Sequence, residues 1–331
     1  MDLDAYSAAH RDDWDRLRRL GRQRSFRGAE ADELIERYQS GTTQLSAIRT
    51  SAGSTAQGDR LSLLLSRARL RFTGAGSNVL SRLPTFFLLA LPAALYRVRW
   101  LTLAIALVTT LIAVLTAVWF IQNPALLGAL GPESVRRAYA EEEFVGYYSA
   151  NSEGSFAGQV WTNNAWIAAQ CVAFGITGFW VPNVIVQNAM GLGQSAAVMH
   201  EFGRLGDFFL YISPHGQLEL YCVFVAAAGG LLIFWSWIAP GARTRGQALS
   251  EDGRALFAIV IGLILGLLVS GIIEGFVTRQ DWPWPVKIGI GTIALAGFLA
   301  YQWMLGARAH RLGETGDLEE FEAGARRIVA G

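Results

Sequence analysis

The sequence predicts an all-α integral membrane protein of about six transmembrane helices, with a helical cytoplasmic amino-terminal segment. Hydrophobic residues make up 52% of the 331 residues and charged residues only 17%, and the mean hydropathy is +0.30. Residues 1–99 hold 16 of the 28 basic and 10 of the 27 acidic residues, whereas long stretches beyond Trp100 carry no charge. We therefore expect a charged cytoplasmic or interfacial segment at 1–99, a transmembrane domain at 100–306 and a cytoplasmic tail at 307–331.

The amino-terminal segment has helical periodicity. Apolar residues from Leu3 to Leu20 recur at near-helical spacing, and a second helical run covers 31–48. The piece at 61–72 mixes leucines with arginines, and the apolar piece at 83–96 is too short and too rich in proline to span a bilayer. Such a pair suits the cytoplasmic surface of a membrane. Helices that pack on one another in a small bundle are an equally good interpretation.

Five apolar stretches follow this segment. A bilayer core of about 30 Å needs roughly 20 apolar residues in a helix, and four of the stretches are clear spans: 100–121, 217–239, 255–277 and 286–306. The fifth, 165–198, has 34 uncharged residues and is interrupted by Pro182 and Asn183. We interpret it as a hairpin of two short spans, at 164–181 and 184–198, which gives six in all. The alternative is five spans, with the second member of the hairpin lying in the interface or re-entering.

Arginines predict the orientation, because cytoplasmic loops retain basic residues. With six spans, the arginines that flank the membrane fall on one side: Arg97, Arg99, Arg243, Arg245, Arg254, Arg308 and Arg311. The opposite side receives the mainly acidic stretch 125–162 and the short loop 278–285. We therefore expect a multi-pass protein of the inner membrane with both termini in the cytoplasm.

Small residues at a spacing of four predict contacts between helices in the membrane. Gly262, Gly266 and Ser270 form one such stripe in the fifth span, and Ala226 and Gly230 form another in the fourth. We expect these faces to pack helices together and to support a homo-oligomer.

Polar residues share the predicted outer level of the spans. His215 and Glu219 lie one turn apart at the start of the fourth span, and Glu274 lies near the end of the fifth. Asn163 and Asn164 begin the second span at the same level. Ionisable groups at membrane depth are costly and commonly functional. These five residues are therefore a candidate outward-facing binding site.

Three interpretations of this polar cluster remain open. Its members can pair with one another and cap helix ends, or they can bind a lipid headgroup, an ion or a partner peptide. A metal site could also be built from His200, His215, Glu219 and Glu274, but their spacing matches no established motif, so we assign no metal. No HExxH, nucleophile elbow or phosphate-binding glycine loop occurs in the sequence. We therefore predict neither an enzyme nor a cofactor, and the net charge of +1 disfavours nucleic acid as a partner.

An ordered set of polar and glycine motifs runs through the chain. It comprises Leu34-Ile35-Glu36-Arg37-Tyr38, 45–50, Asn163-Asn164, Gly175, Gly178, 188–193, Pro214-His215-Gly216 with Glu219, Ala228-Gly229-Gly230 and Ile273-Glu274. This set resembles the stage II sporulation protein M family of bacterial and archaeal membrane proteins. Where family members usually carry Asn-Gly, this chain has Asn188-Ala189.

The resemblance implies a membrane organiser, which in endospore formers acts with peptidoglycan-degrading partners at the engulfing septum. Relatives in bacteria that form no spores are commonly encoded beside a MoxR-type ATPase, and this chain resembles those relatives. We expect a scaffold or anchor of a cell-envelope complex, whose partners are the lipid bilayer, other membrane or envelope proteins and further copies of itself. The alternative is a transporter or channel with His215, Glu219 and Glu274 on the route, which would need a continuous polar path to the cytoplasm.

Overall fold

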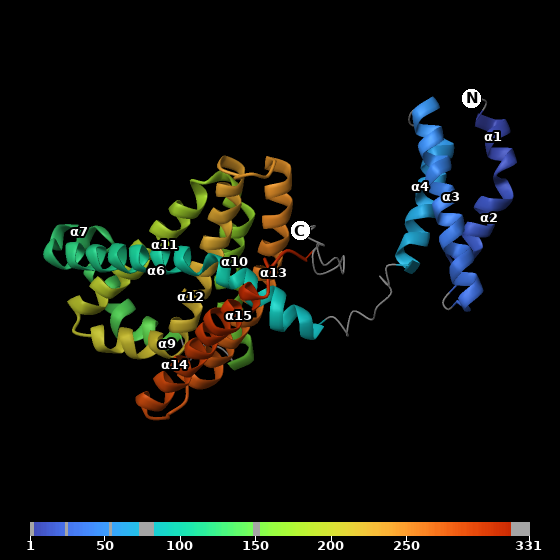
Figure 1. The fold of residues 1–331 in the computed structure, drawn as a ribbon. Helices are drawn as coiled ribbons and strands as arrows, with labels where there is room; N and C mark the ends of the chain where they lie inside the picture. The colour runs from blue at the N-terminus through green and yellow to red at the C-terminus, as the bar shows by residue number, and fades with distance from the viewer. Residues whose placement is uncertain (1–2, 24–25, 53–54, 73–82, 148–152, 319–331) are drawn as a thin grey trace. The chain divides into compact units, whose positions relative to one another are not determined.

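The computed structural model describes residues 3–23, 26–52, 55–72, 83–147 and 153–318. Within these ranges every regular element is a helix and no strand occurs, so the predicted all-α class is confirmed. The chain divides into two compact units, with the boundary between Leu83 and Pro84. Figure 1 shows the helices of each unit.

The amino-terminal unit is a small bundle of helices. Helix α3 packs against α4, and α2 packs against both of them. The bounds of its elements are α1 (Leu3–Ala9), α2 (Arg11–Leu20), α3 (Gly28–Ala52) and α4 (Ala56–Phe72). Ion pairs add to the contact between α2 and α3: Arg16 binds Glu33 at 2.5 Å, and this hydrogen bond holds the pKa of Glu33 below its usual value. Such exposed pairs contribute little to stability, so the bundle depends mainly on its apolar core.

Helix α4 presents its apolar residues to that core. Leu61, Leu64, Leu65 and Ala68 are all buried, at the spacing of one face of an amphipathic helix. They cluster with Leu17 and Leu20 of α2 and with Leu34 and Ile48 of α3. The leucines of the piece 61–72 are thus enclosed by protein, which supports the bundle interpretation over a helix lying on the membrane surface.

Leu61→Ala is expected to destabilise the amino-terminal unit by about 2–5 kcal/mol, because it removes a buried leucine and leaves a cavity. Hydrogen exchange of the amides of α2, α3 and α4 in the full-length protein measures this loss. Leu63→Ala is the matched control: Leu63 is 55% exposed, so its truncation should change stability by no more than about 0.5 kcal/mol. Equal loss of protection in the two variants would contradict the core described here.

The second unit contains the apolar helices. Its regular elements are α-helices joined by short π-helical segments and one 3-10 turn, η3. In chain order they are η1 (Phe86–Ala90), α6 (Leu91–Gln122), α7 (Pro124–Ala129), α8 (Glu133–Ala138), η2 (Tyr139–Glu143), α9 (Phe144–Tyr147), α10 (Glu153–Ala173), η3 (Gly175–Thr177), α11 (Trp180–Glu201), α12 (Leu205–Ile238), α13 (Arg245–Ile273), η4 (Glu274–Thr278), α14 (Trp284–Ala300), η5 (Tyr301–Leu305) and α15 (Gly306–Arg311).

Four helical stretches in the described part of the chain are long and apolar enough to cross a membrane. They are Leu83–Gln122, Leu205–Ile238, Arg245–Thr278 and Trp284–Arg311, and they contain the four clear spans predicted from the sequence. The other two predicted spans fall on the shorter helices α10 and α11, of 21 and 22 residues. These helices support a membrane location, and the total of six spans stays a prediction.

The turn of the predicted hairpin lies earlier than the sequence analysis placed it. The break is at Phe174 to Phe179, where Gly178 has φ +75°, a conformation that favours glycine. Pro182 instead lies in the first turn of α11, where a backbone N–H has no partner within the helix and proline is tolerated. The prediction that Pro182 and Asn183 break the hairpin was therefore wrong.

The first long helix also begins earlier than expected. The piece 83–96, placed with the cytoplasmic segment 1–99, is helical and runs through η1 into α6. Pro92 would disrupt the preceding turn of a regular α-helix. The chain instead forms the π-helical turn η1 directly before Pro92, and such turns accommodate a local change in hydrogen bonding. The boundary between the two compact units lies between Leu83 and Pro84, and the division into a cytoplasmic segment at 1–99, a transmembrane domain at 100–306 and a tail at 307–331 stays a prediction.

Helix α12 is the centre of this unit, because α6, α10, α11, α13 and α14 all contact it. Residues 221–230 of α12 are buried without exception. Small residues let the neighbours approach closely: a Cβ atom at Gly230 would lie 2.1 Å from the carbonyl oxygen of Cys171 in α10. Gly262 lies against the side chain of Leu91 in α6, and Gly266 lies against the side chain of Cys222 in α12. The small residues of these stripes thus lie at contacts between helices of one chain.

The beginning and the end of the unit are joined by polar contacts. Gln302 of η5 donates from Nε2 to the carbonyl oxygen of Leu95 in α6 at 2.8 Å, and Tyr221 of α12 donates to Gln302 Oε1 at 2.5 Å. Tyr301 donates to the carbonyl oxygen of Phe87 at 2.5 Å. Gln302 is fully buried, so each of its polar atoms needs such a partner.

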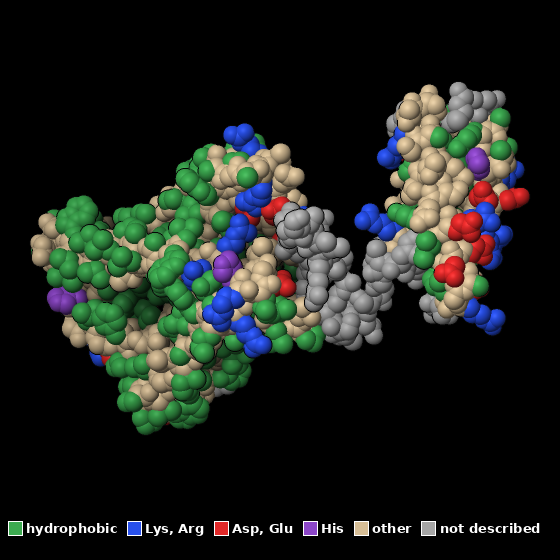
Figure 2. Space-filling view, in the orientation of Figure 1, with side chains coloured by type: hydrophobic (Ala, Val, Ile, Leu, Met, Phe, Trp, Pro, Cys, Tyr) green, Lys and Arg blue, Asp and Glu red, His purple; other side chains and the backbone are tan. Residues whose placement is uncertain are grey.

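Apolar side chains dominate the outer surface of the helices. Leu107 on α6 and Ile293 on α14 are 71% and 73% exposed. Figure 2 shows hydrophobic side chains spread over much of the visible surface of this unit, with basic side chains gathered over the region of α15. Exposed apolar surface of this extent is typical of contact with lipid or with other membrane helices.

Candidate functional site

The candidate site is built from α12 and from η4, which continues α13. His215 and Glu219 lie four residues apart on α12, so their side chains leave the same face of that helix. Glu274 is the first residue of η4. His215 is 5% exposed and Glu274 2% exposed, whereas Glu219 is partly buried.

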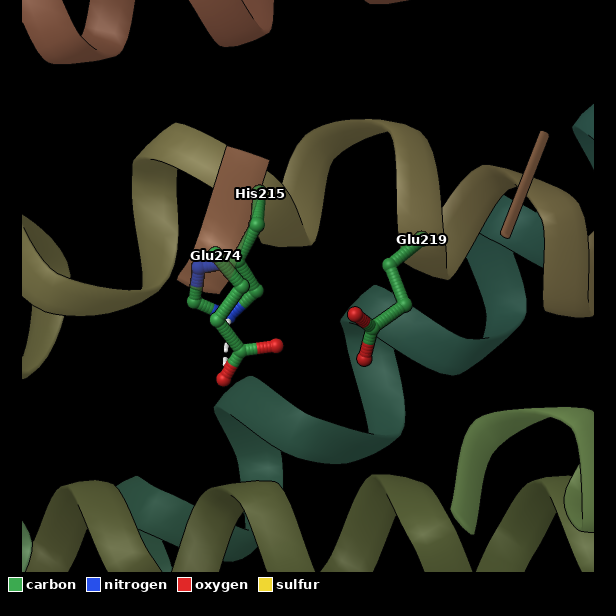
Figure 3. A group of neighbouring side chains, drawn as sticks. All are labelled: His215, Glu219 and Glu274. Carbon is green, nitrogen blue, oxygen red and sulfur yellow. Dashed lines mark ion pairs between the residues drawn. The ribbon is translucent and has the colours of Figure 1, made fainter. Parts of the chain in front are cut away.

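The three side chains converge on one point, as Figure 3 shows. His215 Nε2 lies 3.6 Å from Glu274 Oε1, and one nitrogen or oxygen atom from each of the three residues lies within 4.8 Å of the other two. The two carboxylates face the same space in Figure 3, with the imidazole beside Glu274. The three residues, which the sequence predicts at the same depth in the membrane, thus lie close to one another in the structure.

Two hydroxyl groups orient this group of three. Ser270 Oγ lies 3.2 Å from Glu219 Oε2 and 3.0 Å from the carbonyl oxygen of His215. Thr278 Oγ1 lies 3.4 Å from His215 Nδ1, so the other ring nitrogen, Nε2, is the one that faces the carboxylates. The sequence analysis missed Thr278 and gave Ser270 a packing role alone. The spacing of four from Ser270 to Glu274 and from Glu274 to Thr278 was the signal that could have found both.

Helix α14 supports the site from one side. Gly291 lets α14 approach the backbone of α12, since a Cβ atom there would lie 1.9 Å from the carbonyl oxygen of Pro214. One turn earlier, Lys287 Nζ donates to the carbonyl oxygen of Thr278 at 3.0 Å and lies 3.7 Å from the centre of the Trp284 ring. The buried ammonium group of Lys287 is therefore already hydrogen-bonded at the edge of the site, and it forms no ion pair with the two glutamates.

The group of three does not contain the other predicted residues whose side chains the structure describes. Asn164 lines a different cavity, of ≈ 420 Å³, with Thr109 and Asn188. Asn163 belongs to α10, but its side chain lies outside the described part of the structure. His200, considered above as a metal ligand, is exposed at the end of α11. The candidate site thus contains three of the five predicted residues.

Comparison with known protein families bears directly on this region. The family model for Stage II sporulation protein M matches residues 85–279. The chain belongs to this family. The stage II sporulation protein M region begins close to the structural boundary at Pro84 and ends just after η4, so it contains His215, Glu219 and Glu274.

The amino-terminal unit has its own family match. A domain of unknown function (DUF8413) matches residues 4–74, which covers α1 to α4. No curated protein and no solved structure matches the chain. Each family match therefore lies within one of the two compact units, and the stage II sporulation protein M match ends before α14.

A second polar network of the stage II sporulation protein M region lies near the other end of α12. Asp252, 1% exposed, binds Arg97 of α6 at 2.5 Å and Arg243 at 3.1 Å, and Ser236 of α12 donates to the same carboxylate. A separate pair, Arg254 with Asp317, lies at 2.5 Å. The sequence analysis used these arginines to orient the chain but did not identify Asp252. Its partner Arg97 is 155 residues away in the sequence, so no local pattern marks the pair.

Proposed function

We propose that this stage II sporulation protein M family member is an integral membrane scaffold or anchoring component of a cell-envelope complex. Its helices would lie in the inner membrane, and both termini would lie in the cytoplasm. The role requires a folded unit that reaches the bilayer and a second unit that can hold a partner. It requires no catalytic chemistry.

The observation that carries this proposal is the apolar middle of α12. The His215 group lies towards one end of α12 and Asp252 contacts the other end, and between them residues 222–230 are buried and apolar. The neighbouring core residues are also apolar, including Ile259, Leu263 and Leu267 of α13. The Tyr221–Gln302 contact is polar, but it is neutral and hydrogen-bonded on both sides. A transported ion would have to cross this layer, so the packing favours a scaffold over a conduit.

The two units suggest different partners. The amino-terminal bundle has a charged surface that suits a cytoplasmic protein, and the resemblance described above points to a MoxR-type ATPase. The exposed faces of α6 and α14 suit lipid and the helices of other envelope proteins, of which peptidoglycan-remodelling enzymes are the candidate class. Since Gly230, Gly262 and Gly266 meet residues of their own chain, a homo-oligomer would need another face. Leu107 on α6 is 71% exposed, so we place that contact on the outer face of α6.

Co-purification from native membranes tests the scaffold role. Full-length protein should retain one or more envelope proteins, and loss of residues 1–83 should remove the cytoplasmic ones while the membrane partners stay. A protein that purifies without any stoichiometric partner, under cross-linking as well as without it, contradicts the proposal.

A transporter or channel is the second candidate, and the buried group of His215, Glu219 and Glu274 is the observation that favours it. Ionisable side chains at this depth commonly line a route for ions or protons. Ion or proton flux in proteoliposomes that is lost on Glu274→Gln would select this alternative. Absence of flux would leave the scaffold as the better interpretation.

Labelling of introduced cysteines tests the orientation. Wild-type protein should not react with a membrane-impermeant maleimide, because Cys171 and Cys222 are both buried. We expect Ala242→Cys to react only from the cytoplasmic side, and Glu142→Cys and Asp281→Cys only from the outer side. All three positions are exposed, so each should react once the reagent reaches it. Three spans are predicted between residues 142 and 242, so reaction of both residues from the same side would contradict this odd number.

A further inference from the structure

The charge of the His215 group is unbalanced. Two carboxylates face one another, and in the described part of the chain neither forms an ion pair with an arginine or a lysine. Glu274 is 2% exposed, and its Oε2 atom is buried without a hydrogen-bond partner. Buried charges in proteins are normally paired or coordinate a metal ion, so the space between the carboxylates calls for a positive charge.

We propose that His215, Glu219 and Glu274 bind one divalent transition-metal ion, with Zn²⁺ as the best match. The ligand atoms would be Nε2 of His215 and one carboxylate oxygen from each glutamate. Two carboxylates balance the charge of a divalent ion, and the mixed nitrogen and oxygen set suits Zn²⁺ better than Mg²⁺ or Ca²⁺, which prefer oxygen ligands alone. This site goes beyond the scaffold role and does not depend on it.

The distances suit such an ion after a small adjustment. Ligand atoms around tetrahedral zinc lie about 3.3 Å apart, given Zn–N and Zn–O bonds near 2.0–2.2 Å. The present separation from His215 Nε2 to Glu274 Oε1 is 3.6 Å, and the whole set lies within 4.8 Å. Rotation of the two glutamate side chains would bring the ligand atoms to the separation that zinc requires, because both side chains point into the same space (Figure 3).

The surrounding hydroxyl groups have the arrangement that supports metal ligands. A histidine ligand usually has its second ring nitrogen held by a polar neighbour, and a carboxylate ligand usually accepts a hydrogen bond. Thr278 Oγ1 lies beside His215 Nδ1, and Ser270 Oγ lies beside Glu219 Oε2. Lys287 in turn holds the carbonyl group of Thr278. These contacts orient the ligand atoms towards a common centre.

A polar cavity lies beside the site, at the loop between η4 and α14. Thr278 lines this cavity of ≈ 440 Å³, whose other lining residues include Gln280, Asp281 and Lys287. Asp281 is exposed, so its carboxylate can attract a cation to this cavity, which the buried Thr278 separates from the ligand His215. Three protein ligands leave a fourth position for water, as in sites where the ion exchanges or binds a further group.

Metal binding by tag-free, full-length protein in detergent tests the proposal. After treatment with a chelator and dialysis, the protein should take up one Zn²⁺ per chain, measured by titration calorimetry and elemental analysis. His215→Ala and Glu274→Gln should each weaken Zn²⁺ binding at least ten-fold, which is the usual effect of disturbing a metal site. His200→Ala is the matched control, since it removes an exposed histidine outside the group, and it should bind Zn²⁺ like the wild type. Mg²⁺ at the same concentration should not compete.

Two further measurements separate loss of the site from loss of the fold. Without metal, the unfolding temperatures of Glu274→Gln and wild type should be similar, and Zn²⁺ should raise that of the wild type alone. Co²⁺ in place of Zn²⁺ should give a visible absorption band that requires His215. The proposal is overturned if the wild type binds no Zn²⁺ beyond the level of Glu274→Gln, or if His200→Ala loses binding equally. The first of these results would mean that the group holds protons rather than a metal.

Discussion

Replacement of both Arg97 and Arg243 by alanine should destabilise the membrane unit by about 3–5 kcal/mol, the usual cost of leaving a buried charge without its partner. Asp252 is 1% exposed and depends on these two guanidinium groups for compensation. Adding Asp252→Ala to the double variant should then restore part of the lost stability. The direction of this change in stability is informative. Asp252→Ala is expected to stabilise the double variant only if that variant contains an uncompensated charge at Asp252.

The two native cysteines provide the measurement. Cys171 and Cys222 are buried in the core of the unit, so a maleimide dye that fluoresces on reaction reports unfolding as temperature rises. Arg245→Ala is the control, since Arg245 is exposed and donates to a carbonyl group, that of Trp237. Its effect should stay within about 0.5 kcal/mol. A triple variant no more stable than the double would show that Asp252 is hydrated once its partners are gone.

A single methyl group at residue 291 should have a comparably large effect. Gly291→Ala would place Cβ 1.9 Å from the carbonyl oxygen of Pro214 and 2.7 Å from its carbonyl carbon. Both atoms belong to the backbone, so α14 must move away from α12. Overpacking of this kind costs typically 1–3 kcal/mol and more where the backbone is rigid, so we expect about 3 kcal/mol or more.

Gly297→Ala on the same helix is the matched control for this prediction. No atom lies within 4 Å of the added methyl group, and alanine stabilises a helix relative to glycine by roughly 0.5–1 kcal/mol. The two substitutions are chemically identical, so opposite shifts in the unfolding temperature would isolate the contact with Pro214. Equal shifts would mean that α14 does not pack on α12 as described.

The long helices could be predicted from the sequence because lipid imposes a simple requirement. A span must be long and apolar, and α6, α12, α13 and α14 meet this requirement with little ambiguity. The site was partly predictable for a related reason. Position along a helix sets depth, so His215, Glu219 and Glu274 could be placed at one level from the spacing of residues alone.

The depth of a residue in the membrane does not determine which way its side chain points around the helix axis. The sequence analysis therefore could not tell which of the polar residues at one depth would meet. Asn164 shares the predicted level of Glu274, yet it lines another cavity. The turn between α10 and α11 was misplaced because proline breaks a helix in its interior but is accepted in its first turn, as at Pro182. Asp252 was not identified from the sequence, because its partner Arg97 lies on α6, which is distant in the sequence.

The contacts of Gln302 have a consequence for synthesis of the protein. They join the last long helix of the unit to the carbonyl group of Leu95, 207 residues earlier in the chain. A ribosome therefore releases α6, α10, α11, α12 and α13 into the membrane before the group that completes their core exists. Until then the buried face of α6 at Leu95 and the hydroxyl group of Tyr221 must find temporary partners in lipid, water or the insertion machinery. The unit can reach its final packing only after translation has passed residue 302.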